Sequence, residues 1–390
     1  MARKPYLFIL MMMVMVRRWQ AWIIPFMSRS KRSLPWVAHS RVDKPAATCS
    51  STATGTALQT TSALISVEDC LAMYQQQHDN STSTSKTNIR FVDASWYHKG
   101  ERSGRAEFET GPRLPGAVYF DLDDICDLTH TVPRMLPPPD VLATALREGL
   151  GIMARPSDQL RDADTTQIII VYGKAGARFT PRVWFTLDTL WASEVTKNST
   201  SGSPLVRLLQ GTLEDWMSLG GPVETHAVTT WRLADRLSGP LSFPLSATTS
   251  SRVLTLDKMK DIVLGKMNNT GVNTSQRTLI VDARGSSFAK KGHIPGSIHI
   301  PYTSLLEPNN TCCFKPHEVL QQIFEASGIL PCDPTTRIVC TCNSGVSACS
   351  LYLALRECGV ADEYLTMYDG SWLEWERYRE LPKVMPAPTL

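Results

Sequence analysis

Cys342 is the residue best placed for nucleophilic chemistry. It follows the apolar run Arg337–Thr341, which predicts a β-strand, and it precedes a helical pattern over 350–357. A cysteine in front of a helix N-terminus faces free backbone N–H groups and the positive end of the helix dipole, and both stabilise a thiolate. The same pattern, taken alone, also fits an inert buried cysteine at a strand end.

The residues after Cys342 predict a loop that can hold an anion. A glycine permits the chain to curl, and two serine hydroxyls can donate hydrogen bonds into the loop. A cysteine phosphatase shares this arrangement but needs an arginine six residues after the cysteine to clamp phosphate. Here that position is Ala348, which argues against phosphate chemistry. The predicted active-site loop is Cys342, Asn343, Ser344, Gly345, Val346 and Ser347.

The other cysteines do not form a recognisable scaffold. Ten cysteines are spread over 390 residues, with no CxxC pair and no Cys/His cluster of zinc-finger spacing. We therefore expect reduced thiols, no metal site and no cofactor. Cys349 lies two helical turns beyond Cys342 and is expected to be packed, while Cys312 and Cys313 are expected to be the exposed thiols.

An internal repeat sets the fold class. Four landmarks recur in the same order in both halves: an apolar strand ending in an acid, a Pro-Gly turn, a third strand, and a Gly-to-Trp segment. Short apolar strands alternating with helical stretches favour parallel sheets with helices on both faces. The sequence predicts an α/β fold of two tandem domains. The paired segments are 90–94 and 279–284, 114–120 and 294–300, 168–172 and 337–341, and 211–216 and 370–375.

The first copy lacks a nucleophile. Its run 172–182, which matches the Cys342 loop, holds Gly173 and no cysteine. We expect a catalytically silent domain that supplies walls and charges to the pocket of the other. The predicted segments are a targeting presequence over 1–60, a silent domain over 62–234, a linker rich in Pro and Ser over 235–252, and a catalytic domain over 253–385.

Composition limits the class of protein and its partners. A chain that is 43% hydrophobic and 20% charged is neither disordered nor a multi-span membrane protein, and we expect no membrane span in the mature protein. Its 40 Lys and Arg balance 37 Asp and Glu, so we expect no direct nucleic-acid partner.

The N-terminal segment predicts mitochondrial import. No acidic residue precedes Asp43, while arginines and lysines alternate with serines, as in a transit peptide. A second start at Met27, giving a shorter and cytoplasmic product, is an alternative. Secretion is a weaker one, suggested by the apolar run 6–16. Sequons at Asn80, Asn198, Asn268, Asn273 and Asn309 are interpreted as chance matches.

Both halves resemble rhodanese domains, and residues 62–380 resemble the tandem-domain thiosulfate/3-mercaptopyruvate sulfurtransferases. The resemblance implies that Cys342 takes the outer sulfur of a donor as a persulfide and passes it to a thiol such as thioredoxin or glutathione. Asn343 and Ser344 resemble the mercaptopyruvate branch, and thiosulfate is the second choice of donor. The segments that carry the resemblance are VDASWY (92–97), PGAVYFDLDDI (115–125), PRVWF (181–185), VDAR (281–284), GHIPGS (292–297), CNSGVSAC (342–349) and YDGSWLEW (368–375).

Two departures from the family pattern affect donor binding. Ser287 stands where the family carries an arginine for the anion of the donor, and Arg113 replaces the usual histidine of the first Pro-Gly motif. A carboxylate donor needs a cation. We therefore expect substitute cations to bind the donor, namely Arg178, Arg113, Lys290 and Lys291.

Three further features receive structural interpretations. Arg284 is expected to brace its strand by pairing with a neighbouring carboxylate, and His293 to be a hydrogen-bonded loop residue. The run 369–372 predicts a turn beside the Cys342 loop, with Trp372 and Trp375 as core or pocket wall. Two other functions stay open: a non-catalytic binding module, and sulfur relay to a protein acceptor, as in tRNA thiolation.

Overall fold

The computed structural model describes residues 62–78, 87–98, 102–152, 166–192, 205–233, 250–265, 277–331, 333 and 336–386. The predicted presequence over 1–60, most of the predicted linker, and the sequons at Asn80, Asn198, Asn268 and Asn273 lie outside these residues. All the described residues belong to one compact unit.

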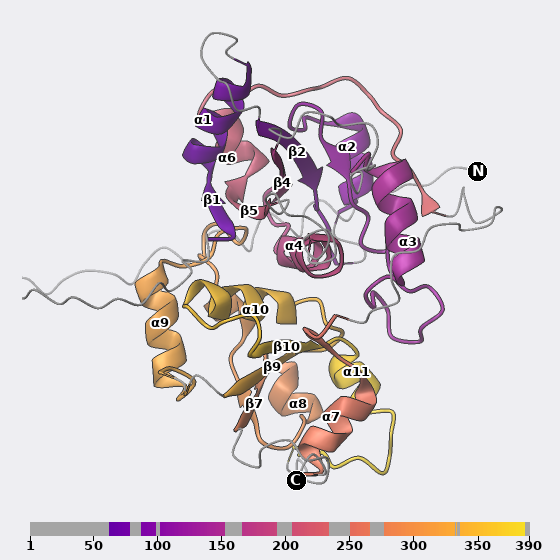
Figure 1. The fold of residues 1–390 in the computed structure, drawn as a ribbon, viewed down its shortest axis with the longest axis vertical. Helices are drawn as coiled ribbons and strands as arrows, with labels where there is room; N and C mark the ends of the chain where they lie inside the picture. The colour runs from indigo at the N-terminus through magenta and orange to yellow at the C-terminus, as the bar shows by residue number, and fades with distance from the viewer. Residues whose placement is uncertain are drawn as a thin grey trace, which may run out of the picture. The chain divides into compact units, whose positions relative to one another are not determined.

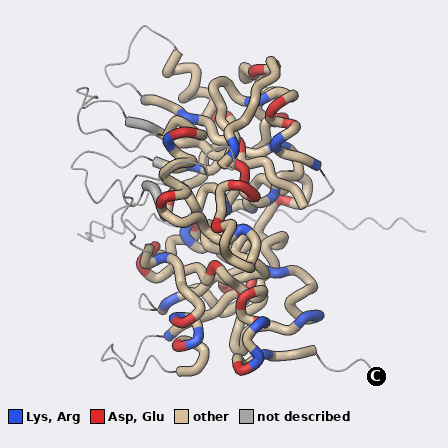
Figure 2. The backbone as a smooth tube through the Cα atoms, turned by 90° about the vertical axis from the view of Figure 1, so that its right-hand side faces the viewer, with Lys and Arg blue, Asp and Glu red and all other residues tan. Residues whose placement is uncertain are grey.

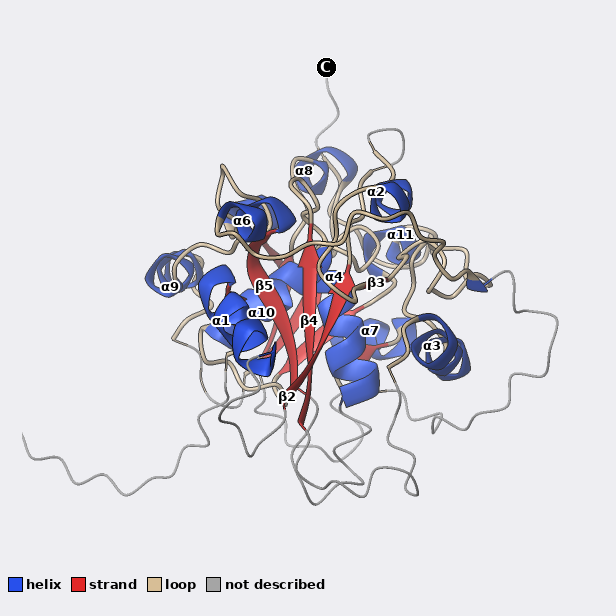
Figure 3. Ribbon diagram, turned by 90° about the horizontal axis from the view of Figure 1, so that it is seen from above, coloured by secondary structure: helices blue, strands red, loops and turns tan. Residues whose placement is uncertain are grey.

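The first domain is built on a five-stranded parallel sheet in the order β1-β5-β4-β2-β3. Figure 3 shows its long strands β2, β4 and β5 side by side. The strands are β1 (Leu64–Ser66), β2 (Thr87–Asp93), β3 (Val118–Tyr119), β4 (Thr166–Gly173) and β5 (Leu205–Thr212). The helices are α1 (Val67–His78), α2 (Gly104–Thr110), α3 (Pro139–Thr144), α4 (Thr180–Thr186) and α6 (Leu213–Ser218), with π-helical turns η1 (Ala145–Gly149) and η2 (Leu187–Ala192) continuing α3 and α4.

The second domain repeats this plan, with a parallel sheet in the order β6-β10-β9-β7-β8 (Figure 1). Its strands are β6 (Val253–Leu254), β7 (Thr278–Asp282), β8 (Ser297–His299), β9 (Arg337–Thr341) and β10 (Leu365–Tyr368). Its helices are α7 (Leu256–Val263), α8 (Ser287–Lys291), the 3-10 turn η5 (Tyr302–Ser304), α9 (His317–Ala326), α10 (Ala348–Glu357) and α11 (Ser371–Trp375). The expected α/β fold with a duplicated parallel sheet is confirmed.

Each sheet is covered on both faces because its strands are apolar on both sides. In the second domain, Val281 and Cys340 pack with residues of α9 and α10, whereas Ile280 and Val339 pack with residues of α7 and α11. The successive residues of a strand thus serve two opposite cores.

The two domains share one apolar core. Residues of β4 and α4 belong to the same buried cluster as residues of β9 and α10. Phe185 of α4 meets Tyr352 of α10 edge to face, with ring centroids 4.9 Å apart. Because this core is continuous, the first domain packs directly against α10, which begins after the Cys342 loop.

Lysines and arginines alternate with acidic residues along the described backbone in the view of Figure 2. This mixture agrees with the formal net charge of +3. No helix among the described residues has the length and apolar character needed to cross a membrane.

Candidate active site

Cys342 lies at the carboxyl end of β9, and its side chain is buried. The strand register shows which residue of the first domain corresponds to it. Asp282 of β7 pairs with Thr341, and Asp93 of β2 pairs with Tyr172. Cys342 and Gly173 are therefore equivalent positions in the two sheets, and a glycine occupies the place of Cys342 in the first domain.

Ser371, on the neighbouring turn, binds the backbone of the Cys342 loop through hydrogen bonds. The N–H groups of Cys342 and Gly345 both donate to Ser371 Oγ, each at 3.1 Å, and Ser371 Oγ donates to the Tyr368 carbonyl at 2.8 Å. The Trp372 N–H donates to the Cys342 carbonyl at 3.1 Å. The predicted turn beside the loop is confirmed, and these bonds tie the loop to it at Cys342 and at Gly345.

The rest of the loop presents unused N–H donors. Within the described part of the chain, the N–H groups of Asn343, Ser344, Val346 and Ser347 donate to no other group. They precede α10, whose first turn adds the positive end of its dipole. A run of free N–H groups around a glycine in the left-handed region, here Gly345 at φ +73°, forms a concave anion site. Such a site stabilises a thiolate or a persulfide anion.

The neighbouring thiols are placed as packing groups. Cys349 and Cys340 are both buried. Burial raises the pKa of Cys349 to about 12, although Arg182 nearby opposes the shift, and burial also raises the pKa of Cys340 well above its usual value. Both remain neutral thiols at physiological pH. The expectation that Cys349 is packed is confirmed.

The expectation that Cys312 is exposed is wrong. Cys312 is buried against the first domain, and its Sγ lies 3.5 Å from the Lys174 carbonyl and 3.4 Å from the Ala177 carbonyl. Burial raises its pKa to about 12. Asn310 anchors the same loop by donating to Asp215 at 2.8 Å. Cys313 is partly exposed.

The first domain supplies an apolar wall to the loop. Val346 packs in one cluster with Trp96, Leu122 and Phe179 of the first domain, and Tyr302 lies against it. Phe179 stands 5.4 Å from both the Trp96 ring and the Tyr302 ring, measured between centroids. The silent loop that ends at Phe179 therefore contributes to the surroundings of the active loop.

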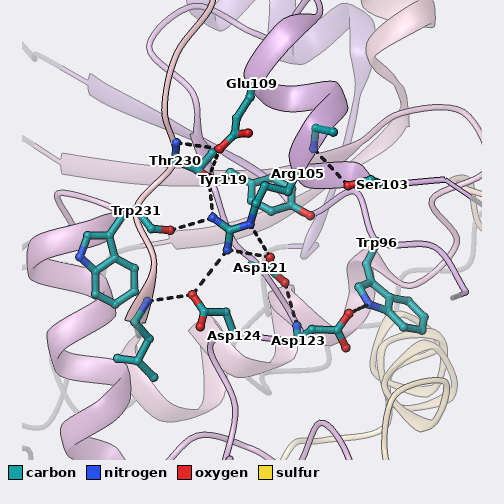
Figure 4. Close-up of polar contacts among 12 residues, drawn as sticks. Trp96, Ser103, Arg105, Glu109, Tyr119, Asp121, Asp123, Asp124, Thr230 and Trp231 are labelled. Carbon is teal, nitrogen blue, oxygen red and sulfur yellow. Dashed lines mark hydrogen bonds and ion pairs between the residues drawn. The ribbon is translucent and has the colours of Figure 1, made fainter. Parts of the chain in front are cut away.

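A polar network orients this wall. Trp96 donates through Nε1 to Asp123 at 2.7 Å, and the Asp123 N–H donates to Asp121 at 2.9 Å (Figure 4). Asp121 in turn accepts from Arg105 Nε at 2.8 Å. Arg105 also bonds the Trp231 carbonyl at 3.0 Å, which joins α2 to the end of the first domain. The indole plane of Trp96 is thus held from α2.

The predicted donor cations lie in different places. Arg113 is buried in the first domain, where it pairs with Glu224 at 3.4 Å and donates to the His226 carbonyl at 2.8 Å. Its guanidinium is occupied by that domain, so its placement does not support donor binding. Arg178 lies on the silent loop, is partly exposed, and has no side-chain partner among the described residues. Lys290 and Lys291 are exposed at the end of α8.

The structural interpretations of Arg284 and His293 are confirmed. Arg284 is buried and pairs with Asp282 at 2.8 Å, directly beneath the carboxyl end of β7. His293 stacks on Phe288 with ring centroids 3.9 Å apart, and its main chain pairs with Val384. Ser287, the position of the missing family arginine, begins α8 and is partly exposed.

Sequence reasoning missed Arg182, and it placed Asp369 and Ser371 in a turn beside the loop without giving either a role. All three are buried and touch the Cys342 loop. They lie within the segments 181–185 and 368–375 that carried the family resemblance, so the signal was present. No role followed from it, because their contacts join residues that are far apart in the chain.

A search of known proteins places the chain in a family. The model of the rhodanese-like domain matches residues 263–378. The chain is 29% identical over 310 residues to the probable 3-mercaptopyruvate sulfurtransferase of Schizosaccharomyces pombe, covering 76% of this chain and 88% of that one. It is also 29% identical over 318 residues to the thiosulfate/3-mercaptopyruvate sulfurtransferase 1, mitochondrial, of Arabidopsis thaliana, covering 76% and 73%.

A solved structure matches across both domains. The crystal structure of SseA from Escherichia coli, described as having the rhodanese fold of 3-mercaptopyruvate sulfotransferases, aligns with a TM-score of 0.56 at 26% identity. The alignment covers 80% of this chain and 99% of that one. With its duplicated sheet and its cysteine loop at the end of β9, the chain belongs to the rhodanese-domain sulfurtransferases of the 3-mercaptopyruvate/thiosulfate sulfurtransferase family.

Proposed function

We propose that the protein moves sulfane sulfur from 3-mercaptopyruvate to a thiol through a persulfide on Cys342. The observation that supports this most is the Cys342 loop, in which a cysteine at a strand end is followed by four N–H groups without acceptors in the described part of the chain. Loops of this kind stabilise the charge that develops on sulfur at each step.

The reaction divides into two transfers. The Cys342 thiolate attacks the donor sulfur, so that an S–S bond forms and the C–S bond breaks. The electron pair of the broken bond stays on carbon, which takes a proton and leaves as pyruvate. A thiolate acceptor, for which thioredoxin and glutathione are the candidates, then attacks the outer sulfur and releases the Cys342 thiolate. With thiosulfate as the donor, an S–S bond would break instead and sulfite would leave.

Three basic side chains of the described residues are candidates to bind the carboxylate of the donor. Arg178 is the best placed of them, because it precedes Phe179, which packs in one cluster with Val346 of the active loop. Lys290 and Lys291 follow Ser287 on α8 and are free of ion pairs among the described residues. A guanidinium can form a bidentate pair with a carboxylate, whereas an ammonium acts as a point charge.

The experiment is sulfur transfer measured on the purified protein with mercaptopyruvate and with thiosulfate in parallel. Mass spectrometry after donor treatment should show one added sulfur on Cys342, and Cys342→Ser should abolish both that mass and turnover. Cys313→Ser is the matched control, since Cys313 is a partly exposed thiol. A Cys342→Ser protein with full activity would refute the role of Cys342. A wild-type protein that takes sulfur from neither donor would favour the binding module or a protein relay.

We also propose import into mitochondria. The acid-free, basic segment before Asp43 supports it, and the Arabidopsis thaliana relative bears the word mitochondrial in its name.

A further inference from the structure

We propose that Arg182 of the first domain is a positioning residue for the Cys342 loop: paired with Asp369, it holds the Gly345 carbonyl and so turns the Val346 N–H away from the buried core. The proposal rests on the function proposed above and extends it, because it gives the first domain, whose own loop has Gly173 in place of a cysteine, a part in positioning the Cys342 loop.

Arg182 and Asp369 form a buried ion pair between the two domains. Arg182 comes from α4, Asp369 follows β10, and Nη1 lies 2.7 Å from Oδ1. The second nitrogen of the guanidinium and the second oxygen of the carboxylate are hydrogen-bonded as well. Arg182 Nη2 donates to the Arg134 carbonyl at 2.7 Å, and the Leu136 N–H donates to Asp369 Oδ2 at 2.7 Å. Neither residue has a fully buried side-chain N or O atom without a hydrogen-bond partner.

A pair so deeply buried is poorly explained by stability. Removing two charges from water costs as much as their attraction returns, and apolar residues of similar volume often serve as well. A buried pair does, however, hold groups in one geometry, because a planar guanidinium and a carboxylate bond in fixed directions. The groups that this pair holds are therefore the clue to its role.

The group held on the catalytic side is the peptide that follows Gly345. Arg182 Nη1 donates to the Gly345 carbonyl at 3.3 Å, and Cys349 Sγ donates to the same oxygen at 3.4 Å. Asp369 also closes off the space around this residue: a Cβ on Gly345 would lie 2.4 Å from Asp369 Oδ1. The carbonyl thus points into the buried region between α4 and α10.

The geometry of the peptide then sets the direction of the next donor. In a planar trans peptide the C=O and the N–H point in opposite directions. With the Gly345 carbonyl held against Arg182, the Val346 N–H points away from Arg182. It is one of the loop N–H groups that have no acceptor among the described residues. A flip of this peptide would turn an oxygen lone pair to the side where the thiolate and the persulfide carry their charge.

The test removes the pair without leaving a buried charge. In the Arg182→Met/Asp369→Leu variant both charges are replaced by apolar side chains of similar volume, which buried sites often tolerate. Asp188→Asn is the matched control, because Asp188 pairs across the same two domains with Arg356 of α10 at 3.3 Å but touches no residue of the loop. Folding of each variant is verified by denaturant unfolding.

The first measurement is the rate at which iodoacetamide alkylates Cys342, followed against pH. We expect the midpoint of this profile to rise by about one pH unit in the double variant, as the loss of one favourable donor implies. In the Asp188→Asn control it should stay at the wild-type value. Because alkylation uses no sulfur donor, this result is independent of whether the protein transfers sulfur.

The second measurement is steady-state kinetics with mercaptopyruvate. We expect kcat to fall about tenfold or more while KM changes less than about threefold, since the loop acts on the charge that develops during transfer. Arg182→Lys, which keeps the charge but not the fork, should lie between the wild type and the double variant in both measurements.

Two results would overturn the proposal. The first is an unchanged alkylation profile in a folded double variant or, should that variant not fold, in Arg182→Lys. The second is a raised KM with an unchanged kcat, which would make Arg182 a donor-binding residue instead.

Discussion

Replacing Ser371 by alanine should destabilise the protein more than its small size suggests. Ser371 is fully buried, and its hydroxyl oxygen accepts from the N–H groups of Cys342 and Gly345 while donating to the Tyr368 carbonyl. Alanine removes all three bonds. Each of the two N–H donors then loses its partner in a buried place, at about 1 to 3 kcal/mol each. We expect the free energy of unfolding to fall by about 2 to 6 kcal/mol.

A second substitution separates the hydroxyl from the backbone. Ser371 has φ 53°, in the left-handed region that glycine adopts at little cost. Ser371→Gly loses the same bonds but relieves the strain of a side chain at this φ, so it should be about 1 kcal/mol more stable than Ser371→Ala. Ser371→Thr keeps the hydroxyl but adds a methyl group at a strained position. Its stability therefore does not report on the hydroxyl, and only its activity is compared with that of the wild type.

The assay is urea unfolding of the purified variants, with stability taken from the midpoint and the slope. Ser304→Ala is the control, because its hydroxyl donates only to the nearby Pro301 carbonyl, at 2.7 Å. That control should lose less than about 1 kcal/mol. If Ser371→Ala unfolds with the same free energy as Ser304→Ala, then the two loop N–H groups are not held by this hydroxyl and the account of the loop is wrong.

Three further predictions concern the donor, the pH and the N-terminal segment. Arg178→Ala should raise KM for mercaptopyruvate about ten- to a hundredfold, because it loses one charge-assisted hydrogen bond to the donor. Equal kinetics of Arg178→Ala and the wild type would exclude Arg178 as the donor cation. Arg113→Ala should instead lower the free energy of unfolding by about 3 kcal/mol, because it breaks a buried polar network. Burial raises the pKa of the Cys349 thiol from 9.0 to about 12, so between these values the folded state keeps a proton that the unfolded state loses. The stability that this thiol contributes below pH 9 should therefore be lost as the pH rises toward 12. In Cys349→Ala the free energy of unfolding in urea should depend less on pH over this range. Residues 1–60 fused to a fluorescent reporter should direct it to mitochondria, and secretion or glycosylation of the reporter would favour a signal peptide.

Cys342 and its loop could be predicted as the candidate site because their evidence is local. A strand pattern, Cys342 at its end, Gly345 and a helix pattern follow one another within 337–357. The register of the two sheets then aligned Cys342 with Gly173, as the repeat had indicated. The pairing of Arg284 with Asp282 was equally accessible, since the two residues stand two apart on one strand end.

The fate of the other charged and polar groups depended on the packing of the two domains. Arg113, Arg178 and Arg182 look alike in the sequence as basic residues of the first copy. Only the tertiary structure shows that their environments differ. Arg113 bonds to Glu224 and His226, Arg178 is partly exposed, and Arg182 forms an ion pair with Asp369. Cys312 gives a second example. Its loop has the sequence of a surface loop, yet Cys312 is buried because Asn310 of the same loop donates to Asp215 of the first domain.

The sequence by itself determined the duplicated parallel fold, the candidate nucleophile and the family, because periodicity, turn residues and motifs are properties of short segments. The tertiary structure alone decided which buried groups contact the Cys342 loop. Gly345, Arg182 and Ser371 come from three separate stretches of chain, and they meet only because α4 and α10 share one core. Hydrogen bonds and ion pairs depend on distances of about 3 Å, and no pattern in the sequence reports a distance between residues so far apart.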